Sequence, residues 1–302
     1  VSGVDVAGLE YKRHGPPESY HDGPARDKRG PLAENRPENH RPMSTHPHAH
    51  DAPGLLPISR LEPPLRPVLV ATDVDGTLTR AGKLDPAALG AILRLVEAGV
   101  AVVPVSGRPA GEVAGLCRYL PGVARGLAEN GLLEVIPDRA PRWLRTPTDK
   151  ARLRRVGERL NAEHAAGLRL TGDDFCRLGD IAYEREGRDE AELVRLRGLA
   201  EAMGVHLVWS NVHVHLAEAV PDKGVAVLQL AEEIGVDPRA IVTIGDAPND
   251  AGLFVSGRFG ATVGTADIAA QLAFVPEPPQ YVTRSREGAG FVEMAEAILQ
   301  ML

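Results

Sequence analysis

Short apolar runs and longer amphipathic stretches alternate along much of the chain. Val68 to Ala71 and Val100 to Val105 are apolar runs of the kind found in strands buried on both faces. Between them, Asp85 to Ala98 places apolar residues at helical spacing, and Gly99 ends that helix. The alternation continues with a helix and a strand, at Pro109 to Tyr119 and Val123 to Ala128. This pattern predicts a parallel α/β sheet with helices on both faces.

The alternation breaks around residues 139–142 and is replaced by a block with another order. Two predicted helices, Asp149 to Ala166 and Asp189 to Met203, are each followed by two short strands. The four predicted strands are Gly167 to Thr171, Gly179 to Glu184, Val205 to Trp209 and Val212 to Ala217. An α-β-β-α-β-β order favours helices on one face of an antiparallel sheet. We therefore predict a small α+β domain at residues 141–218.

The first alternation returns after this block, so the small domain is an insertion in a larger one. The predicted elements are a helix at Lys223 to Ile234, a strand at Ala240 to Ile244, a short helix near Pro248, a strand near Gly260 to Val263 and a helix at Gly288 to Met301. The larger domain would comprise residues 67–140 and 219–302.

Residues 1–66 lack this patterning. They hold six of the ten histidines and many prolines, and they show almost no apolar periodicity. Such a segment buries too little apolar surface to offset the entropy of ordering. We expect a disordered Pro/His-rich tail, without the apolar core of a signal peptide.

Composition and charge exclude several classes of protein. The 302 residues are 43% hydrophobic and 25% charged, and no apolar run approaches the roughly 20 residues that span a bilayer. Acidic and basic residues balance in residues 1–66, so the net charge of -7 falls on the remainder, which disfavours nucleic acid as a partner. Cys117 and Cys176 form no CxxC pattern. We expect neither a disulfide scaffold nor a zinc ribbon, and a cytoplasmic location.

Two acidic turns follow predicted buried strands. Asp73 and Asp75 come after the first strand, and Asp246 and Asp250 follow the strand that ends at Ile244. The carboxyl ends of parallel strands meet at one edge of a sheet, where ligands bind. Neighbouring carboxylates repel unless a cation lies between them, and such hard oxygen ligands suit magnesium. Each turn alone can also be structural, as a strand-end turn or as a helix cap.

Two further segments favour an anion. Ser106, Gly107 and Arg108 end the second buried strand and precede a helix, where a hydroxyl and free backbone amides can bind phosphate. Lys223, at the start of a helix, offers the compact positive charge that a phosphoryl group needs. Ser106 as an ordinary helix cap and Lys223 as an ordinary surface lysine are the alternatives.

In order and spacing, the four segments resemble the motifs of the haloacid dehalogenase superfamily of magnesium-dependent phosphotransferases. The resemblance covers Val68 to Leu302 and implies a Rossmann-like parallel sheet core with the insertion as a type IIB cap. Ala128-Glu129-Asn130-Gly131 resembles the ENG segment found ahead of such caps. The compact cap and Tyr281-Val282-Thr283 resemble the sucrose-phosphatase and mannosyl-3-phosphoglycerate-phosphatase group, which also includes phosphoglycolate phosphatases.

The resemblance implies roles for individual residues. Asp73 would be the nucleophile, and Asp75 the general acid and base. The residues that would bind phosphate or substrate are Ser106, Gly107, Arg108, Asn130, Lys223 and Asn249. Magnesium would be held by Asp73, the main-chain oxygen of Asp75, and Asp246, with Asp250 close by or acting through water. Ala247 departs from the pattern, since many relatives have Ser there, and we expect lowered or altered activity at most.

The cap would choose the leaving group. His213 and His215 are two residues apart on its last strand and so share one face, which either contacts the substrate or lies outward in solvent. Trp209, in an apolar run, is expected in the core of the cap.

The expected activity is magnesium-dependent hydrolysis of a small phosphorylated metabolite, a sugar phosphate or sugar phosphoglycerate, through an aspartyl phosphate. A phosphoglycolate phosphatase, a phosphomutase or another phosphotransferase would use the same Asp73 and stay open as alternatives. A non-catalytic binding protein would be expected to have lost these acidic residues. No oligomeric state follows from the sequence.

Overall fold

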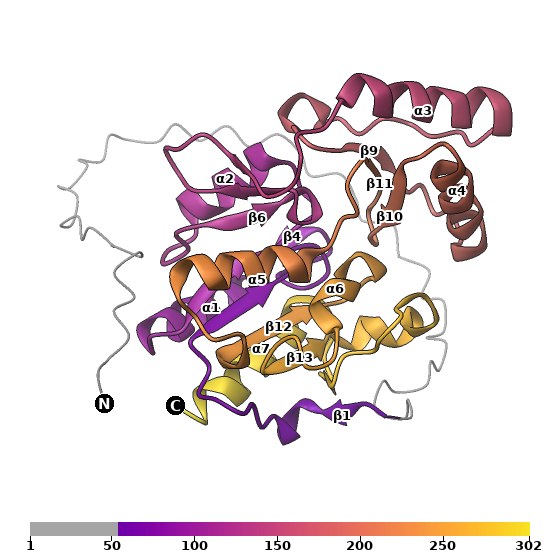
Figure 1. Cartoon of the computed structure of the whole chain (residues 1–302). Helices are drawn as coiled ribbons and strands as arrows, with labels where there is room; N and C mark the ends of the chain where they lie inside the picture. The colour runs from indigo at the N-terminus through magenta and orange to yellow at the C-terminus, as the bar shows by residue number, and fades with distance from the viewer. Residues whose placement is uncertain (1–53) are drawn as a thin grey trace, which may run out of the picture. The chain divides into compact units, whose positions relative to one another are not determined.

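The computed structural model describes residues 54–302, shown in Figure 1, and residues 1–53 of the expected tail lie outside the described residues. The tail boundary expected at residue 66 is wrong. Leu55, Ile58 and Leu61 are buried, and strand β1 (Leu56–Pro57) pairs in parallel with β14 (Tyr281–Val282). A two-residue strand followed by one short 3-10 turn is too brief to show an apolar period, so composition alone misplaced the boundary.

The predicted parallel sheet is confirmed. Six strands lie in the order β1-β14-β13-β12-β2-β5, and every neighbouring pair is parallel. The four central strands are β2 (Leu69–Thr72), β5 (Ala101–Pro104), β12 (Ile241–Gly245) and β13 (Ala261–Gly264). Every residue of these four strands is buried except Ala101, the first residue of β5, as their unbroken apolar pattern predicts.

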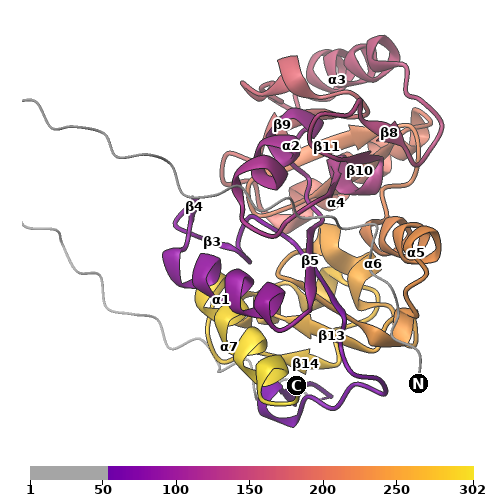
Figure 2. The same ribbon diagram turned by 90° about the vertical axis from the view of Figure 1, so that its left-hand side faces the viewer.

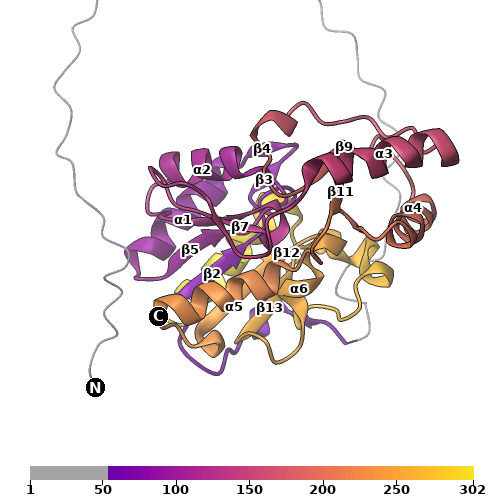
Figure 3. The same cartoon turned by 45° about the horizontal axis from the view of Figure 1, so that its top comes forward.

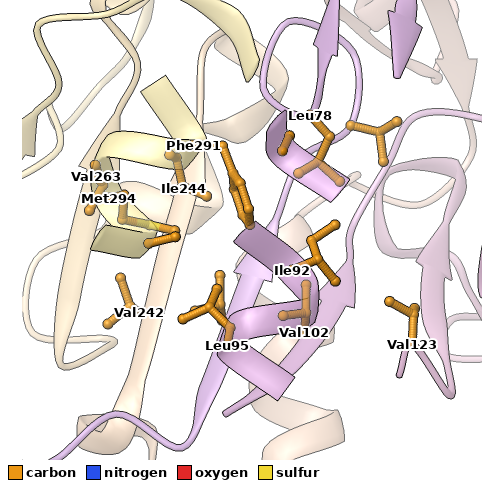
Figure 4. Close-up of a cluster of buried hydrophobic side chains, with 14 of the residues drawn as sticks. Leu78, Ile92, Leu95, Val102, Val123, Val242, Ile244, Val263, Phe291 and Met294 are labelled. Carbon is orange, nitrogen blue, oxygen red and sulfur yellow. The ribbon is translucent and has the colours of Figure 1, made fainter. Parts of the chain in front are cut away.

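Helices cover both faces of this sheet. Helices α1 (Pro86–Glu97) and α7 (Glu287–Leu299) pack side by side on one face (Figure 2). Figure 4 shows their apolar side chains against the sheet, with Ile92 and Phe291 facing Val102 and Ile244. Helix α5 (Lys223–Ile234), which Figure 3 shows over the strands, and α6 (Ala251–Phe254) cover the other face. Along β2, Val70 therefore packs on one apolar cluster while Leu69 and Ala71 pack on the other.

Local capping explains where the first helix begins. The side chain of Asp85 accepts a hydrogen bond from the backbone N–H of Ala87, and Pro86 occupies the first helical position. Asp149, Asp189 and Asp222 cap other helices in the same way.

The strand expected at Val123 to Ala128 is shorter and lies in a small antiparallel sheet outside the main parallel sheet. Strand β6 (Gly126–Ala128) follows helix α2 (Ala110–Tyr119) and pairs antiparallel with β7 (Leu133–Val135), which pairs with β8 (Arg142–Trp143). Its link to the main sheet is one parallel bridge between Leu127 and Val105. The chain turns back on itself at Glu129–Gly131 instead of entering another helix, so β6 cannot continue the parallel order.

The inserted segment forms a separate antiparallel sheet in the order β10-β11-β9. Its elements are helices α3 (Lys150–His164) and α4 (Glu190–Ala202) and strands β9 (Ile181–Glu184), β10 (His206–Trp209) and β11 (His213–Ala217). They share an apolar cluster of their own. The limits at residues 141 and 218 stay predictions.

One of the four strands expected in the insertion is wrong. Gly167 to Thr171 contributes a single bridge, between Leu170 and Tyr183. Ala165 and Gly167 have positive φ values of 50° and 60°, so the chain is still turning where the strand was expected to begin. Too few extended residues remain to form a ladder.

Short elements complete the described chain. They are the hairpin β3 (Thr79–Arg80) and β4 (Lys83–Leu84) and the 3-10 turns Ile58–Arg60, Asp174–Cys176, Pro238–Ala240, Pro248–Asp250, Ala266–Ala270 and Leu272–Phe274. Among residues 54–302, no helix combines the length and apolar character needed to cross a membrane.

Candidate active site

Three adjacent parallel strands end at the site. Asp73 follows β2, Asp246 follows β12, and Ser106 lies just beyond β5, which flanks β2 on its other side. The backbone N–H of Asp73 donates to the carbonyl oxygen of Ile244 at 2.9 Å, which joins the two acidic turns. Gly76 has a φ of 86°, and a Cβ there would overlap the Asp246 carboxylate. Gly76 of the first turn is therefore needed for the close approach of the second.

Four charged side chains are buried together at this edge. One carboxylate oxygen from each of Asp73, Asp246 and Asp250 lies within 4.8 Å of the others. Lys223, fully buried, donates to Asp73 Oδ1 at 2.5 Å and to Asp250 Oδ1 at 2.6 Å. Lys223 is thus no surface lysine. The first turn of α5 places it there, directly after the capping residue Asp222.

The charges in this cluster do not balance. Burial raises the pKa of Asp73 to about 7, although Lys223 acts in the opposite direction. Burial and the neighbouring Asp73 and Asp250 also raise the pKa of Asp246. Burial opposes the Lys223 ammonium, but Asp250 and Asp73 outweigh it and raise the pKa of Lys223. Three buried carboxylates against one ammonium leave excess negative charge, so the donor set fits a divalent cation bound through oxygen.

Asp246 and Asp250 of the second acidic turn have different roles, which the sequence left open. Asp250 Oδ2 accepts the backbone N–H groups of Asp246 at 2.9 Å and of Ala247 at 3.0 Å. The capping role therefore belongs to Asp250, and Asp246 is held with its carboxylate directed to the site. Thr77 Oγ1 donates to Asp246 Oδ1 at 3.0 Å, and Asn211 of the inserted segment donates to Oδ2.

The turn after β5 offers donors to an anion. Ser106 Oγ accepts the backbone N–H of Arg108 at 3.1 Å and does not cap α2, which begins after Pro109. The backbone of Asn130 donates to the Ser106 carbonyl at 2.9 Å, and Asn249 Nδ2 donates to Asn130 Oδ1 at 3.0 Å. Asn130 Nδ2 is buried, and within residues 54–302 it has no hydrogen-bond partner. An amide donor is therefore available beside the turn.

Asp75 and Arg108 form a partly exposed ion pair. Arg108 Nε donates to Asp75 Oδ2 at 2.6 Å, and Arg108 Nη2 donates to Asp75 Oδ1 at 2.7 Å. Arg108 Nη1 also reaches Glu112 Oε2 at 3.3 Å. The guanidinium thus holds the carboxylate through two parallel hydrogen bonds.

The two histidines of β11 are buried, so the solvent-facing alternative is wrong. His215 Nδ1 lies 2.8 Å from Asp180 Oδ2, and a Cβ on Gly107 would lie 3.2 Å from His215 Nε2. Burial lowers the pKa of His215, and burial with neighbouring cations lowers the pKa of His213 to about 4. Both rings are therefore neutral at pH 7. Trp209, 1% exposed, lies in the apolar cluster of the inserted segment as expected.

A set of buried charges links the ENG turn to the inserted segment, and of these the sequence had marked Glu129 but neither Arg177 nor Asp180. Arg177 Nη1 donates to the Gly107 carbonyl and to Asp180 Oδ1, both at 3.0 Å. Although burial opposes it, Arg177 and His215 hold the pKa of Asp180 below its usual range. Glu129 accepts four backbone N–H groups, from Ala110, Leu178, Gly179 and Asp180. Arg177 and Asp180 are single charged residues in a loop and carry no periodic signal, so no sequence pattern marks them.

A parallel α/β sheet with two acidic turns and a buried lysine at its carboxyl edge defines a haloacid dehalogenase-type hydrolase. A family model described as haloacid dehalogenase-like hydrolase matches residues 202–274. A phosphoglycolate phosphatase of Methanoculleus marisnigri is 31% identical over 231 residues, which cover 74% of this chain and 93% of that protein. A phosphoglycolate phosphatase of Pyrobaculum neutrophilum is 31% identical over 235 residues, which cover 76% of this chain and 95% of that protein. The chain belongs to the haloacid dehalogenase-like hydrolases and is a phosphatase.

Solved structures agree with this fold. A protein from Thermoplasma acidophilum aligns with a TM-score of 0.64 at 21% identity, over 78% of this chain and 99% of that one. The sucrose-phosphatase of Synechocystis, in complex with sucrose and phosphate, aligns with a TM-score of 0.55 at 18% identity, over 78% and 98%. At these identities the likeness concerns the fold alone.

Proposed function

We propose that this phosphatase hydrolyses phosphoglycolate, or a closely similar short phospho-acid, with magnesium and through a phosphoryl group carried on Asp73. The cluster of Asp73, Lys223, Asp246 and Asp250 is the observation that supports the chemistry. The substrate is proposed from the relatives, which are phosphoglycolate phosphatases about 30% identical over nearly their full length. The sequence favoured a sugar phosphate with phosphoglycolate as the alternative, and these relatives favour the alternative.

Magnesium would be held by Asp73, Asp246 and the main-chain oxygen of Asp75, with Asp250 beside them. When bound, it would supply positive charge to the phosphoryl oxygens, on which negative charge is concentrated during transfer. The excess of buried carboxylates supports this assignment.

The residues divide the reaction between them. A carboxylate oxygen of Asp73 attacks phosphorus, and the bond from phosphorus to the leaving oxygen breaks. Asp75, protonated at that moment, gives its proton to the leaving oxygen. A water molecule then attacks the aspartyl phosphate and gives a proton to Asp75, which releases inorganic phosphate and restores Asp73.

The surrounding donors bind and orient the phosphoryl group. Lys223 lies beside the attacking carboxylate and offers charge to the phosphoryl oxygens. Ser106 and the unpartnered Nδ2 of Asn130 would bind the same group from the turn after β5. Asn211 extends from the inserted segment to Asp246, so the cap contributes to the wall that keeps bulk water from the labile intermediate.

The test is release of free phosphate from a panel of substrates with magnesium. The panel contains 2-phosphoglycolate, sucrose 6-phosphate, glucose 6-phosphate and a mannosyl phosphoglycerate, and the Asp73→Asn variant serves as the blank. We expect the highest kcat/KM for 2-phosphoglycolate. A sugar phosphate turned over tenfold better would overturn the proposed substrate, and transfer to an organic acceptor without free phosphate would identify a phosphotransferase.

A further inference from the structure

Within residues 54–302, the cationic side chains of Lys223, Arg177 and Arg108 contact the turns of the site, and of these three Arg108 is the one exposed to solvent. The side chain of Lys223 is 0% exposed and is held by Asp73 and Asp250. The side chain of Arg177 is also 0% exposed, and its nitrogens bond to Asp173, Asp180 and the Gly107 carbonyl. Arg108, by contrast, keeps 25% of its side chain exposed, and its partner Asp75 keeps 16%.

The two histidines of β11 add no positive charge to the site. His213 and His215 are neutral at pH 7, because burial lowers the pKa of both. The hollow that Asp75 also lines contains the carboxylates of Asp246, Asp267 and Glu287, and Asp267 is already paired with Arg286. A second negative charge on a substrate therefore finds its accessible positive partner at Arg108.

The geometry of Arg108 suits this task. Its Nε and Nη2 already bind one carboxylate, that of Asp75, through two parallel hydrogen bonds. A guanidinium fork binds any carboxylate in the same way, so a carboxylate on the leaving group competes directly with Asp75. The charge of Arg108 also acts on His213 of the inserted segment, where it contributes to lowering the pKa of that ring.

We propose that Arg108 is the specificity-determining residue. Its guanidinium exchanges the carboxylate of Asp75 for the carboxylate of the substrate. The inference rests on the proposed function, in which the leaving group is a short acid. A substrate without the second charge cannot displace Asp75, whose carboxylate then stays clamped away from the leaving oxygen. Recognition of the acid is thus coupled to the freedom of Asp75 to act, and it affects kcat as well as KM.

The test compares two substrates of the same chain length, only one of which carries this second charge. 2-Phosphoglycolate and 2-hydroxyethyl phosphate share chain length and ester, but the second lacks the carboxylate. In Arg108→Gln we expect the ratio of their kcat/KM values to fall at least tenfold, the scale of a lost charge-assisted hydrogen bond. Arg108→Lys, which keeps the charge but not the fork, should give an intermediate ratio. Arg118→Gln, in the last turn of the helix that follows Arg108 and paired with exposed Asp138, is the matched control.

A direct binding measurement separates recognition from turnover. In the Asp73→Asn background, calorimetry with 2-phosphoglycolate should show a Kd at least tenfold higher when Arg108→Gln is added. An unchanged substrate ratio, including an equal loss toward both substrates, would overturn the role of Arg108. Failure of the wild-type protein to hydrolyse 2-phosphoglycolate, while it hydrolyses other phosphates, would instead overturn the proposed function.

Discussion

Asp73 carries the chemistry, and its surroundings make it an unusual carboxylate. It is buried, it contacts Lys223, and its pKa is raised to about 7 by burial. An amide at this position keeps the shape and a hydrogen-bond acceptor for Lys223, but it cannot attack phosphorus. It also removes one of three mutually repelling charges.

We therefore expect Asp73→Asn to lower kcat at least about 1,000-fold, the scale seen when a nucleophile is removed. Its melting temperature should change by less than about 4 °C, since little packing is lost. Phosphate release and a thermal melt on the same sample measure both quantities. Substantial residual turnover would show that Asp73 is not the nucleophile.

His213 should make stability depend on pH. Its pKa is lowered from 6.5 to about 4 by burial and by neighbouring cations, so the folded state binds fewer protons than the unfolded state between these values. Its contribution is complete above pH 6.5 and is lost as pH falls toward 4. The full loss is about 3 kcal/mol in the free energy of unfolding.

Urea titrations of the wild type and His213→Gln across pH 4.5 to 7.5 measure this effect. The wild type should lose more stability than the variant as pH falls. Val212→Gln places the same amide beside β11 without removing a titratable group, so its difference from the wild type should not vary with pH. A pH-independent difference for His213→Gln as well would contradict the assignment.

The short element Glu129–Gly131 holds the inserted segment to the core. Glu129 has a φ of 52° and accepts four backbone N–H groups, three of them from residues 178–180. Glutamine would turn an N–H₂ group toward donors that need an acceptor. We expect Glu129→Gln to lower the free energy of unfolding by about 2 kcal/mol. Chemical denaturation checks this against Glu97→Gln at the exposed end of α1, for which a similar loss would refute the explanation.

Strand β1 and the turn after it are part of the core. Ile58 is 3% exposed, whereas Leu56 in the adjacent strand is 41% exposed. Ile58→Ala should therefore lower the free energy of unfolding by about 2 to 4 kcal/mol, and Leu56→Ala by less than about 1 kcal/mol. Equal losses for the two variants in urea denaturation would show that this segment is not part of the core.

For the molecule as a whole, magnesium should act as a stabilising ligand. A cation that binds the folded state alone adds about 2.7 kcal/mol at one hundred times its Kd. Thermal melts with and without excess chelator measure this without reference to turnover. Asp246→Asn should lose most of the magnesium-dependent rise in Tm, while Asp267→Asn, which lies outside the carboxylate cluster, should keep it. A rise that survives in Asp246→Asn would place the ion elsewhere.

The sequence alone determined the parallel sheet, most of the helices and the residues of the two acidic turns. Apolar period and capping act over a few neighbouring residues, so they can be read directly, as the agreement of Lys223–Ile234 with its predicted range shows. The rule that parallel strands end at one edge then placed Asp73 and Asp246 together before any contact was known.

Only the tertiary structure decided what depends on distant partners. Arg108 meets Asp75 across 33 residues, His215 meets Asp180 across 35, and Arg177 meets Gly107 across 70. Whether His213 and His215 face solvent depended on which elements cover β11, and whether Gly167 to Thr171 formed a strand depended on its neighbours. Local sequence fixes the preference of each segment, but the free energy of a buried charge pair exists only once the fold has brought both partners out of water.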